Sequence, residues 1–258
     1  MNRIVIAGGS GFLGQTLAQY FRDRGDEVLV LTRRPGRRAA GGGELTWDGC
    51  TPGNWAKAVD GAMAVINLAG RSVNCRYTRK NRREIFDSRI DSTRVLGEVM
   101  ARCATPPRVW INASTATIYR HTYGPAWDES GAIGGTPAVK DEFSVGVATA
   151  WEQALWGAPA KLTRKIALRC AMVLGRQGNS VFPVLKRLAW LGLGGRMAGG
   201  RQFVSWVHEL DFCRAVDWLL RHDDFAGPVN LGSPNPVTNA EMMEAVRALV
   251  GRGADLSS

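Results

Sequence analysis

A glycine-rich turn near the N-terminus constrains the fold of this chain more than any other feature. Residues 8–14 read G-G-S-G-F-L-G, which is the pattern G-x-x-G-x-x-G. An apolar, β-branched run at 3–7 precedes the turn and predicts a buried strand, and the apolar spacing at 13–24 predicts a helix. A second apolar run at 27–32 predicts another strand. The first 32 residues therefore predict a strand–helix–strand unit.

Strand and helix patterns keep alternating along the next part of the chain. The runs that predict strands lie at 44–47, 64–69, 108–113 and 165–170, and those that predict helices lie at 78–103 and 143–156. Residues 120–142 are rich in glycine, proline and charge and predict a long loop. Strands that alternate with helices are typical of a parallel sheet with helices on both faces. The expected fold class is α/β, with a Rossmann-type doubly wound parallel sheet.

The pattern changes after Gly175. In this part, helices are predicted at 181–191, 210–220 and 239–250, and strands at 202–207 and 228–231. No linker composition separates these segments from the rest of the chain. We therefore expect a cofactor-binding domain over 1–174 and a smaller substrate-side lobe over 175–258 that is interleaved with the sheet.

Composition excludes several classes of protein. Apolar residues make up 45% of the 258 residues and charged residues 22%, so a disordered or collagen-like chain is excluded. No apolar run approaches the length of about 18 residues that a membrane-spanning helix needs, and the first strand begins too early for a signal peptide. Five cysteines without C-x-x-C spacing favour neither a disulfide framework nor a zinc site. We expect a cytoplasmic protein with no metal and no membrane partner.

The chain is strongly basic, with a formal net charge of +10. Two clusters carry much of this charge. One contains Arg33, Arg34, Arg37 and Arg38, and the other contains Arg76, Arg79, Lys80, Arg82 and Arg83. Such charge suggests an acidic ligand, a nucleic acid or an anionic surface, although either cluster can also be a solvated face. Because no nucleic-acid-binding motif accompanies the clusters, we expect no nucleic-acid partner.

The glycine turn has the residues that a dinucleotide site requires. Gly8 allows a tight turn, Gly11 allows the backbone to approach a pyrophosphate, and Gly14 allows the helix to pack on the strand. The diphosphate then lies on the free N–H groups of the helix N-terminus. The alternative is a glycine turn that holds no ligand. The cofactor-binding residues predicted here are Gly8, Gly9, Ser10, Gly11, Phe12, Leu13 and Gly14.

The end of the second predicted strand indicates which dinucleotide is preferred. A site for NAD places an acidic residue there to bind the ribose 2′-hydroxyl, whereas this chain has Thr32, Arg33 and Arg34. Two guanidinium groups can bind a 2′-phosphate, and each charged hydrogen bond contributes about 1.5–3 kcal/mol. We therefore predict NADP(H) as the cofactor, with a preference over NAD on the order of 10- to 1,000-fold. The alternative is that both side chains point to solvent.

Further motifs resemble one protein family. Residues 67–70, 88–93, 114–119 and 151–152 read N-L-A-G, S-R-I-D-S-T, S-T-A-T-I-Y and W-E. Residues 191–195, 200–202, 205–208 and 230–234 read L-G-L-G-G, G-R-Q, S-W-V-H and N-L-G-S-P. With the glycine turn, these segments cover essentially the whole chain. They resemble the epimerase family, an atypical group of extended short-chain dehydrogenases/reductases described as nucleoside-diphosphate-sugar epimerases. Members of this family continue past the position of Ser258, so the resemblance implies a shortened C-terminal lobe here.

The resemblance implies a catalytic arrangement that this chain matches only in part. Typical members of the superfamily use a Ser or Thr, a Tyr, and a Lys four residues after the Tyr, for acid–base chemistry beside a hydride donor. Ser144 and Ala148 occupy the positions of the Tyr and the Lys, and no Tyr-x-x-x-Lys occurs anywhere in the chain. The catalytic residues predicted from the resemblance are Thr115, the adjacent Ser114, and Tyr119. A proton relay can be rebuilt from Thr115, Tyr119, Ser144 or Lys140, and all four remain open.

The resemblance also assigns residues to the two ligands. The additional cofactor-side positions are Leu68, Ala69, Gly70, Arg89 and Ser114, and the substrate-side positions are Asn179, Arg201 and His208. For Arg89, the alternatives are a phosphate of the cofactor or substrate and a salt bridge on the helix surface. For Asn179, the alternative is a plain loop. For His208, the alternative is a structural role.

Two functions follow from these features. The first is an NADP(H)-binding oxidoreductase or epimerase that acts on a small carbonyl, hydroxyl or sugar-type substrate. The second is a dinucleotide-binding sensor or scaffold without turnover, which the missing Tyr-Lys pair favours.

Overall fold

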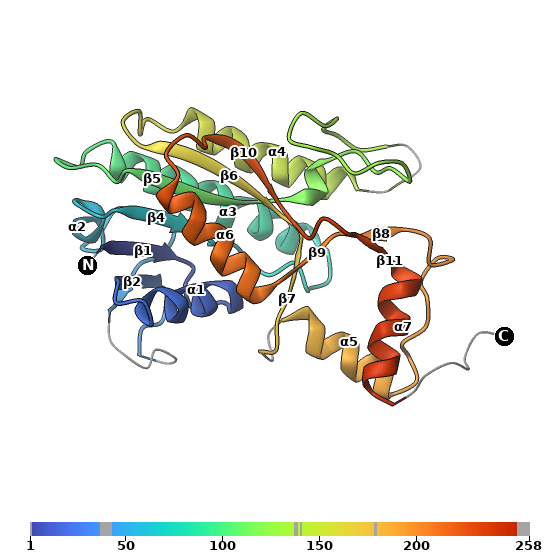
Figure 1. The fold of residues 1–258 in the computed structure, drawn as a ribbon. Helices are drawn as coiled ribbons and strands as arrows, with labels where there is room; N and C mark the ends of the chain where they lie inside the picture. The colour runs from blue at the N-terminus through green and yellow to red at the C-terminus, as the bar shows by residue number, and fades with distance from the viewer. Residues whose placement is uncertain (1, 37–42, 137–138, 140, 178–179, 252–258) are drawn as a thin grey trace.

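A seven-stranded parallel sheet forms the centre of the molecule (Figure 1). A computed structural model of the chain describes residues 2–36, 43–136, 139, 141–177 and 180–251. The strands lie in the order β10-β6-β5-β4-β1-β2-β3, and every pairing between neighbours is parallel. Their bounds are β1 Arg3–Ala7, β2 Glu27–Thr32, β3 Glu44–Thr46, β4 Ala64–Asn67, β5 Val109–Thr115, β6 Arg164–Cys170 and β10 Gly227–Leu231. The predicted Rossmann-type fold is confirmed.

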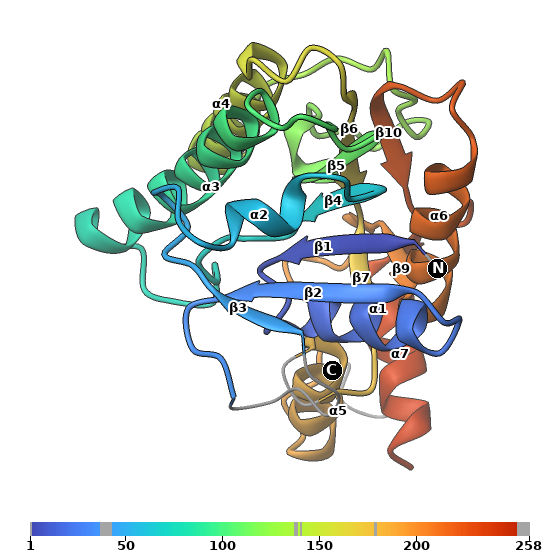
Figure 2. The same ribbon diagram turned by 90° about the vertical axis from the view of Figure 1, so that its left-hand side faces the viewer.

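Helices cover both faces of the sheet (Figure 2). On one face lie α1 Phe12–Arg22 and α6 Glu209–Arg221, and on the other lie α2 Ala56–Val59, α3 Arg79–Met100 and α4 Glu142–Gly157. The alternation of side chains along β1 supplies both cores. Ile4 and Ile6 pack in the cluster that contains Leu17 of α1, whereas Val5 packs in the cluster that contains Leu96 of α3. A strand buried on both faces is a continuous apolar run, as the sequence indicated.

The strand order reverses direction at β1, and this reversal locates the site. β1 pairs with β4 on one side and with β2 on the other. Ligands of open α/β sheets bind beyond the carboxyl ends of the strands at such a reversal. The turn at Gly8–Gly11 leaves β1 at this edge, and the segment after Asn67 leaves β4 beside it.

The later part of the chain forms a small lobe but also returns to the main sheet. The lobe contains α5 Val181–Trp190 and α7 Asn239–Leu249, with the pairs β7 Met172–Leu174 on β9 Trp206–His208 and β8 Phe203–Val204 on β11 Val237–Thr238. Ala189, Met242 and Val246 form its core. Between these segments, α6 and β10 add to the main layers. The division of the chain at residue 174 stays a prediction.

The expected strand at 202–207 was wrong as one element. The structure breaks it at Ser205, because β8 pairs with β11 and β9 pairs with β7 in a different sheet. β5 is longer than expected, since Ser114 and Thr115 continue its ladder with Arg169 and Cys170 of β6. The expected strand ended at residue 113, because the polar residues Ser114 and Thr115 interrupt the apolar run.

All five cysteines are free thiols. None of the described helices combines the length and the apolar composition needed to cross a membrane. Within the described ranges, no group of three or more His, Cys, Asp or Glu side chains is arranged to hold a metal ion.

We predict that Gly14→Ala destabilises the protein by roughly 1–3 kcal/mol, because the new methyl group overpacks the turn. A Cβ at Gly14 would lie 2.3 Å from the Cα of Gly9 and 2.8 Å from the carbonyl oxygen of Gly8. Gly146→Ala in α4 is the matched control, since a Cβ there meets nothing within 4 Å. The control should stabilise the helix by up to about 1 kcal/mol. Urea unfolding measures both, and equal midpoints would contradict the packing argument.

Candidate functional site

The glycine turn after β1 contacts both strands that flank β1. It is hydrogen-bonded to β2 and lies close to the segment after β4. The Gly8 N–H donates to the carbonyl of Leu31 in β2 at 3.2 Å, and the Gly11 N–H donates to the carbonyl of Gly8 at 3.1 Å. Gly8 has a φ of +76°, and a Cβ there would lie 2.7 Å from the backbone nitrogen of Ala69. Only glycine satisfies both the positive φ and the close approach to the segment after β4.

The N-terminus of α1 is open to a ligand. Gly11 is the N-cap residue and offers no side-chain cap, and the first turn contains no acidic residue. A Cβ at Gly11 would meet only the carbonyl oxygen of Gly8, at 3.5 Å. Ser10 and Gly11 are exposed, while Phe12 and Leu13 are partly buried at the start of the helix. Free N–H groups and the positive end of the helix dipole therefore face an accessible surface, which is the arrangement that binds a diphosphate.

A buried amide network holds the segment Leu68–Gly70 against this turn. Asn67, fully buried, accepts from the Ala69 N–H at 3.1 Å through Oδ1. Its Nδ2 donates to Asn112 Oδ1 at 2.7 Å and to Thr93 Oγ1 at 3.2 Å. Leu68, Ala69 and Gly70 were predicted from the sequence as cofactor-side residues, whereas Asn67 and Asn112 were not. Two asparagines that each follow three apolar residues of an expected strand were the available signal, and they are register partners in β4 and β5.

Arg33 and Arg34 follow β2 and are both exposed. Thr32 is buried, and its Oγ1 accepts from the Arg34 N–H at 3.3 Å, so the threonine fixes the start of this turn. Within the described residues, no carboxylate pairs with either guanidinium; the nearby Glu44 accepts instead from the Gly36 N–H at 2.5 Å. Both charges are therefore available to a phosphate. Arg37 and Arg38 lie outside the described residues.

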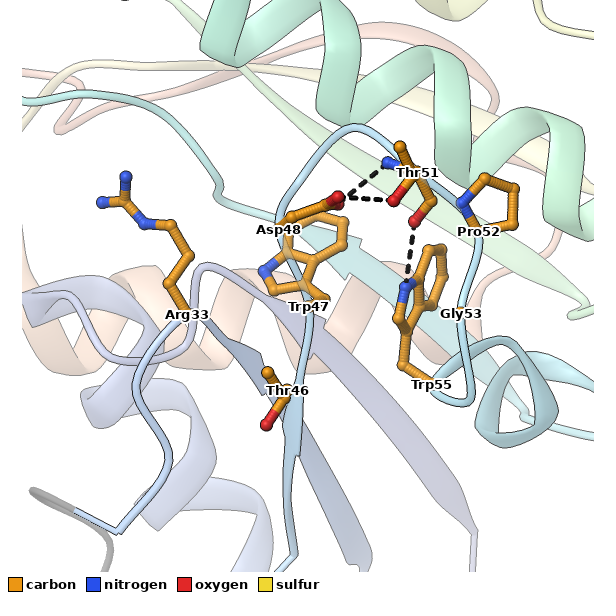
Figure 3. A pocket seen from close by; sticks show the side chains of 8 residues that line it. All are labelled: Arg33, Thr46, Trp47, Asp48, Thr51, Pro52, Gly53 and Trp55. Atoms are coloured by element: carbon orange, nitrogen blue, oxygen red, sulfur yellow. Dashed lines mark hydrogen bonds between the residues drawn. The ribbon is translucent and has the colours of Figure 1, made fainter.

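A pocket of about 460 Å³ lies beside Arg33, beyond the ends of β2 and β3 (Figure 3). Its wall includes Trp47 and Trp55, whose rings meet edge to face with centroids 5.4 Å apart. The remaining lining residues are Thr46, Asp48, Thr51, Pro52 and Gly53. No sequence pattern predicted this pocket, because its walls come from a short edge strand and the loop that follows it.

The carboxylate in this pocket is already occupied by its own loop. Asp48 accepts from the Thr51 hydroxyl and from the N–H groups of Cys50 and Thr51. The Thr51 hydroxyl, followed by the two backbone N–H groups, lowers the pKa of Asp48 well below its usual range. Figure 3 shows Arg33 extended on the other side of Asp48, without a hydrogen bond to any of the residues drawn.

Ser114 lies on a buried ion pair near the end of β5. Its hydroxyl donates to Glu152 Oε1 at 2.6 Å, and Arg169 donates to both oxygens of Glu152 at 2.9 and 2.8 Å. Less than a tenth of each of these three residues is exposed. The hydrogen bonds to Glu152 raise the pKa of Arg169 further above its usual range, which stabilises the charged pair. Sequence reasoning missed Arg169, although an arginine in an apolar strand beside a glutamate in an apolar helix is a signal for such a pair.

Tyr119 is bound to the same ion pair. Its hydroxyl accepts from Arg169 Nη1 at 2.8 Å and donates to Asn230 Oδ1 of β10 at 2.7 Å. The Asn230 backbone N–H donates to Glu129 Oε1 at 2.7 Å, so the network also anchors the loop after Tyr119. The hydroxyls of Ser114 and Tyr119 thus have partners within the protein, and their predicted catalytic roles stay predictions.

Thr115 is, unlike Ser114 and Tyr119, a candidate hydroxyl on a partly exposed residue. It ends β5 and begins the short 3-10 helix η1 Ala116–Ile118, where its Oγ1 accepts from the Thr117 N–H at 3.2 Å. Cys170 stands opposite it in the sheet, and burial raises the pKa of that thiol to about 12. The thiol is therefore protonated at neutral pH, and no thiolate stands beside the Thr115 hydroxyl at this position.

The positions of the missing Tyr-Lys pair lie on α4. Ala148 is fully buried against Ile118 and Tyr119, so an apolar contact fills the place of the lysine. Ser144 lies in the first turn of α4 and is partly exposed. Lys140 lies outside the described residues.

The substrate-side residues differ in how they are held. The Arg201 guanidinium lies 5.9 Å from the ring of Tyr123, in the loop after β5, and Arg201 is exposed. His208 caps the N-terminus of α6, with its Nδ1 accepting from the Leu210 N–H at 3.2 Å, as the structural alternative predicts. Asn179 lies outside the described residues.

Arg89 lies on α3 below the segment Leu68–Gly70. Its Nη1 donates to the carbonyls of Arg71 at 3.1 Å and Ile85 at 2.9 Å. A Cβ at Gly70 would lie 3.1 Å from the Arg89 Cζ. The alternative of a helix-surface salt bridge was wrong for the part of the chain that the structure describes, because backbone carbonyls take the place of a carboxylate.

The sheet order, the glycine turn and the open helix behind it define a Rossmann-type protein of the short-chain dehydrogenase/reductase class. The sequence model of the NAD dependent epimerase/dehydratase family matches residues 4–232, and the chain belongs to this family. The resemblance drawn from the sequence motifs is thereby confirmed.

Relatives match nearly the whole chain. Epimerase family protein SDR39U1 of Mus musculus is 32% identical over 98% of this chain and 82% of its own length. Epimerase family protein ML0860 of Mycobacterium leprae is also 32% identical, over 98% of this chain and 79% of its own length. The crystal structure of human SDR39U1 with NADPH superimposes with a TM-score of 0.84 at 30% identity, and the match covers 98% of this chain and 81% of that one.

We predict that Glu152→Ala lowers the free energy of unfolding by roughly 3–5 kcal/mol, because it leaves the Arg169 charge buried without its partner. Glu98→Ala is the matched control. Glu98 pairs with Arg94 at 2.8 Å on the exposed face of α3, where a pair contributes at most about 1 kcal/mol. Urea unfolding compares the two variants. A loss at position 152 no larger than that at 98 would contradict the structural role of the buried pair.

Proposed function

We propose that this protein binds NADP(H) and acts as an oxidoreductase or epimerase on a small carbonyl, hydroxyl or sugar-type substrate. One observation carries the proposal: an uncapped helix N-terminus behind a glycine turn lies beside two exposed arginines at a strand end that has no acid. Residues 8–14 would hold the diphosphate, and Thr32, Arg33 and Arg34 would hold the 2′-phosphate. Leu68, Ala69 and Gly70 would border the cofactor on the other side of the turn.

The residues present fit such a cofactor. Gly11 leaves open space where a side chain would block a diphosphate, and the pocket beside Arg33 lies at the same edge of the sheet. A relative of this chain, human SDR39U1, has a crystal structure with NADPH, which supports our proposal of NADP(H) as the cofactor here. When bound, the cofactor would supply hydride transfer. We also propose that the protein is cytoplasmic and has no nucleic-acid partner.

Thr115 is the residue we assign to the reacting oxygen of the substrate. It ends β5 at the carboxyl edge of the sheet, and its side chain is partly exposed. A hydroxyl at this position can donate a hydrogen bond to a carbonyl oxygen or accept one from a substrate hydroxyl. Ser114 and Tyr119 would act by fixing the strand end and the following loop, through Glu152 and Arg169.

A second candidate function is a dinucleotide-binding sensor or scaffold that does not turn over. The buried Ala148 at the lysine position favours it, since no cation stands there to support a proton donor. Turnover separates the two candidates: an enzyme consumes NADPH with some member of a carbonyl panel, and a sensor binds NADPH without consuming it.

We predict that Arg33→Ala/Arg34→Ala weakens NADPH binding at least about tenfold and leaves NADH binding unchanged, because only NADPH carries the 2′-phosphate. Arg79→Ala/Arg83→Ala removes the same charge from the exposed start of α3 and should bind both dinucleotides as the wild type does. Isothermal titration measures all the affinities. If wild-type protein bound neither dinucleotide, the oxidoreductase proposal and the sensor proposal would both be wrong.

We predict that Thr115→Val lowers the rate of NADPH consumption by about 100-fold with the best substrate of the panel, since proton-donating groups typically contribute this much. Its NADPH affinity should stay unchanged. Thr105→Val removes an exposed hydroxyl before the other end of β5 and should keep the rate of the wild type. Equal rates in the two variants would remove Thr115 from the reacting centre.

A further inference from the structure

A run of positive charge leads into α3 and has no role in the proposed function. Residues 61–83 contain six arginines and lysines and no aspartate or glutamate. The helix itself compensates two of these cations. Lys80 lies 4.0 Å from a carboxylate oxygen of Glu84, and Arg83 lies 3.3 Å from one of Asp87. Part of the charge at the start of α3 is thus balanced within the chain.

Three arginines at this place have no such balance. Arg76, Arg79 and Arg82 are all exposed, and none of them forms an ion pair with a described residue. Asp141 and Glu142 stand at the start of the neighbouring helix α4, but neither is paired with these arginines in the described ranges. Figure 2 shows the first turns of α3 at the outer edge of the molecule, where a second molecule can reach them.

The position of these charges is unfavourable for the helix. Thr78 caps α3, and its first turn holds no acidic residue, so the cations lie at the positive end of the helix dipole. Arg79 also stands three and four residues before Arg82 and Arg83, a spacing at which like charges repel. By contrast, α4, α6 and α7 each carry an acidic residue in the first turn. A sequence that departs from a local rule in this way indicates a function for the charges.

Exposed aromatic side chains accompany the arginines. Phe86 is 37% exposed and lies on the same face of α3 as Arg79 and Arg82, at helical spacing. Tyr77 is 44% exposed, and its ring packs edge to face on Phe143 of α4 with centroids 5.5 Å apart. The Arg82 guanidinium lies 5.8 Å from the first ring and 4.8 Å from the second. These contacts hold Tyr77 and Arg82 in place without removing them from the surface.

We propose that Arg76, Tyr77, Arg79, Arg82 and Phe86, the α3 patch, bind an acidic segment of a partner protein that carries apolar side chains beside its carboxylates. Carboxylates would complement the unpaired guanidinium groups. Arginine, tyrosine and phenylalanine are the residue types enriched at protein interfaces, where lysine is depleted. A phosphate backbone would satisfy the arginines but would leave Phe86 without an apolar partner. The inference goes beyond the proposed function and does not depend on NADP(H).

The test uses a fluorescently labelled peptide in which pairs of glutamates alternate with pairs of leucines, titrated into the full chain at physiological salt. One analogue has glutamine in place of glutamate, and a second has serine in place of leucine. Oligouridylate and phosphatidylserine vesicles represent nucleic acids and anionic membranes. The variants are Arg79→Glu/Arg82→Glu and Phe86→Ser. The control Lys186→Glu/Arg187→Glu makes the same change of charge at exposed positions of α5.

We expect the peptide to bind at least about tenfold more weakly to Arg79→Glu/Arg82→Glu, several-fold more weakly to Phe86→Ser, and normally to the control. Both analogues should bind the wild type several-fold more weakly than the peptide does. The Arg79→Glu/Arg82→Glu variant should also melt at a higher temperature than the wild type, because it places acids at the positive end of the helix.

Several results would overturn the proposal. The first is a wild type that does not bind the peptide, and the second is an equal loss of affinity in the control. The third is unchanged affinity in Phe86→Ser, which would show that the apolar side chains have no part. Tighter binding of oligouridylate or of vesicles than of the peptide, lost in Arg79→Glu/Arg82→Glu, would assign the patch to a phosphate-bearing partner instead. A lower melting temperature of that variant would contradict the electrostatic argument.

Discussion

The contact of two backbone turns at the carboxyl edge of the sheet is the constraint on which the site depends. Gly8 approaches the segment after β4 so closely that a Cβ would lie 2.7 Å from the Ala69 nitrogen. Asn67 holds that segment from below, with its Oδ1 on the Ala69 N–H. The approach brings the end of β1 against the end of β4, and α1 then starts with its N-terminus facing outward. Because β1 and β2 are parallel neighbours, the free N–H groups at the start of α1 and the arginines after β2 share this edge.

The two halves of the site are stabilised by different interactions. On the cofactor side, backbone packing and buried amides leave the charged groups free, so the cations can bind phosphate. On the substrate side, the buried pair of Glu152 and Arg169 takes up the hydroxyls of Ser114 and Tyr119. The geometry of β5, β6 and β10 is thereby fixed, and Thr115 is left partly exposed at the strand end. Thr115 is therefore the group on this side that we propose meets the substrate.

The fold was predictable because its signals are local. Apolar runs identified all seven strands of the main sheet, and the spacing of the glycines located the turn and the start of α1. The charge after β2 was likewise visible, since Thr32, Arg33 and Arg34 are consecutive. The partners of Arg169, the pocket beside Trp47 and Trp55, and the break at Ser205 were not predictable. Each of these features depends on which distant segments of the chain contact one another. The sequence pattern shows only the spacing of apolar residues within a single segment.

Hydrogen–deuterium exchange with and without NADPH tests the central claim most directly, because it locates the ligand on the chain. We predict slower exchange in peptides that contain Gly9–Leu13 and in those that contain Arg33 and Arg34. NADH should protect the first set and leave the second nearly unchanged, since it lacks the 2′-phosphate. Protection by NADPH confined to other segments, with exchange at the glycine turn unaltered, would contradict the account.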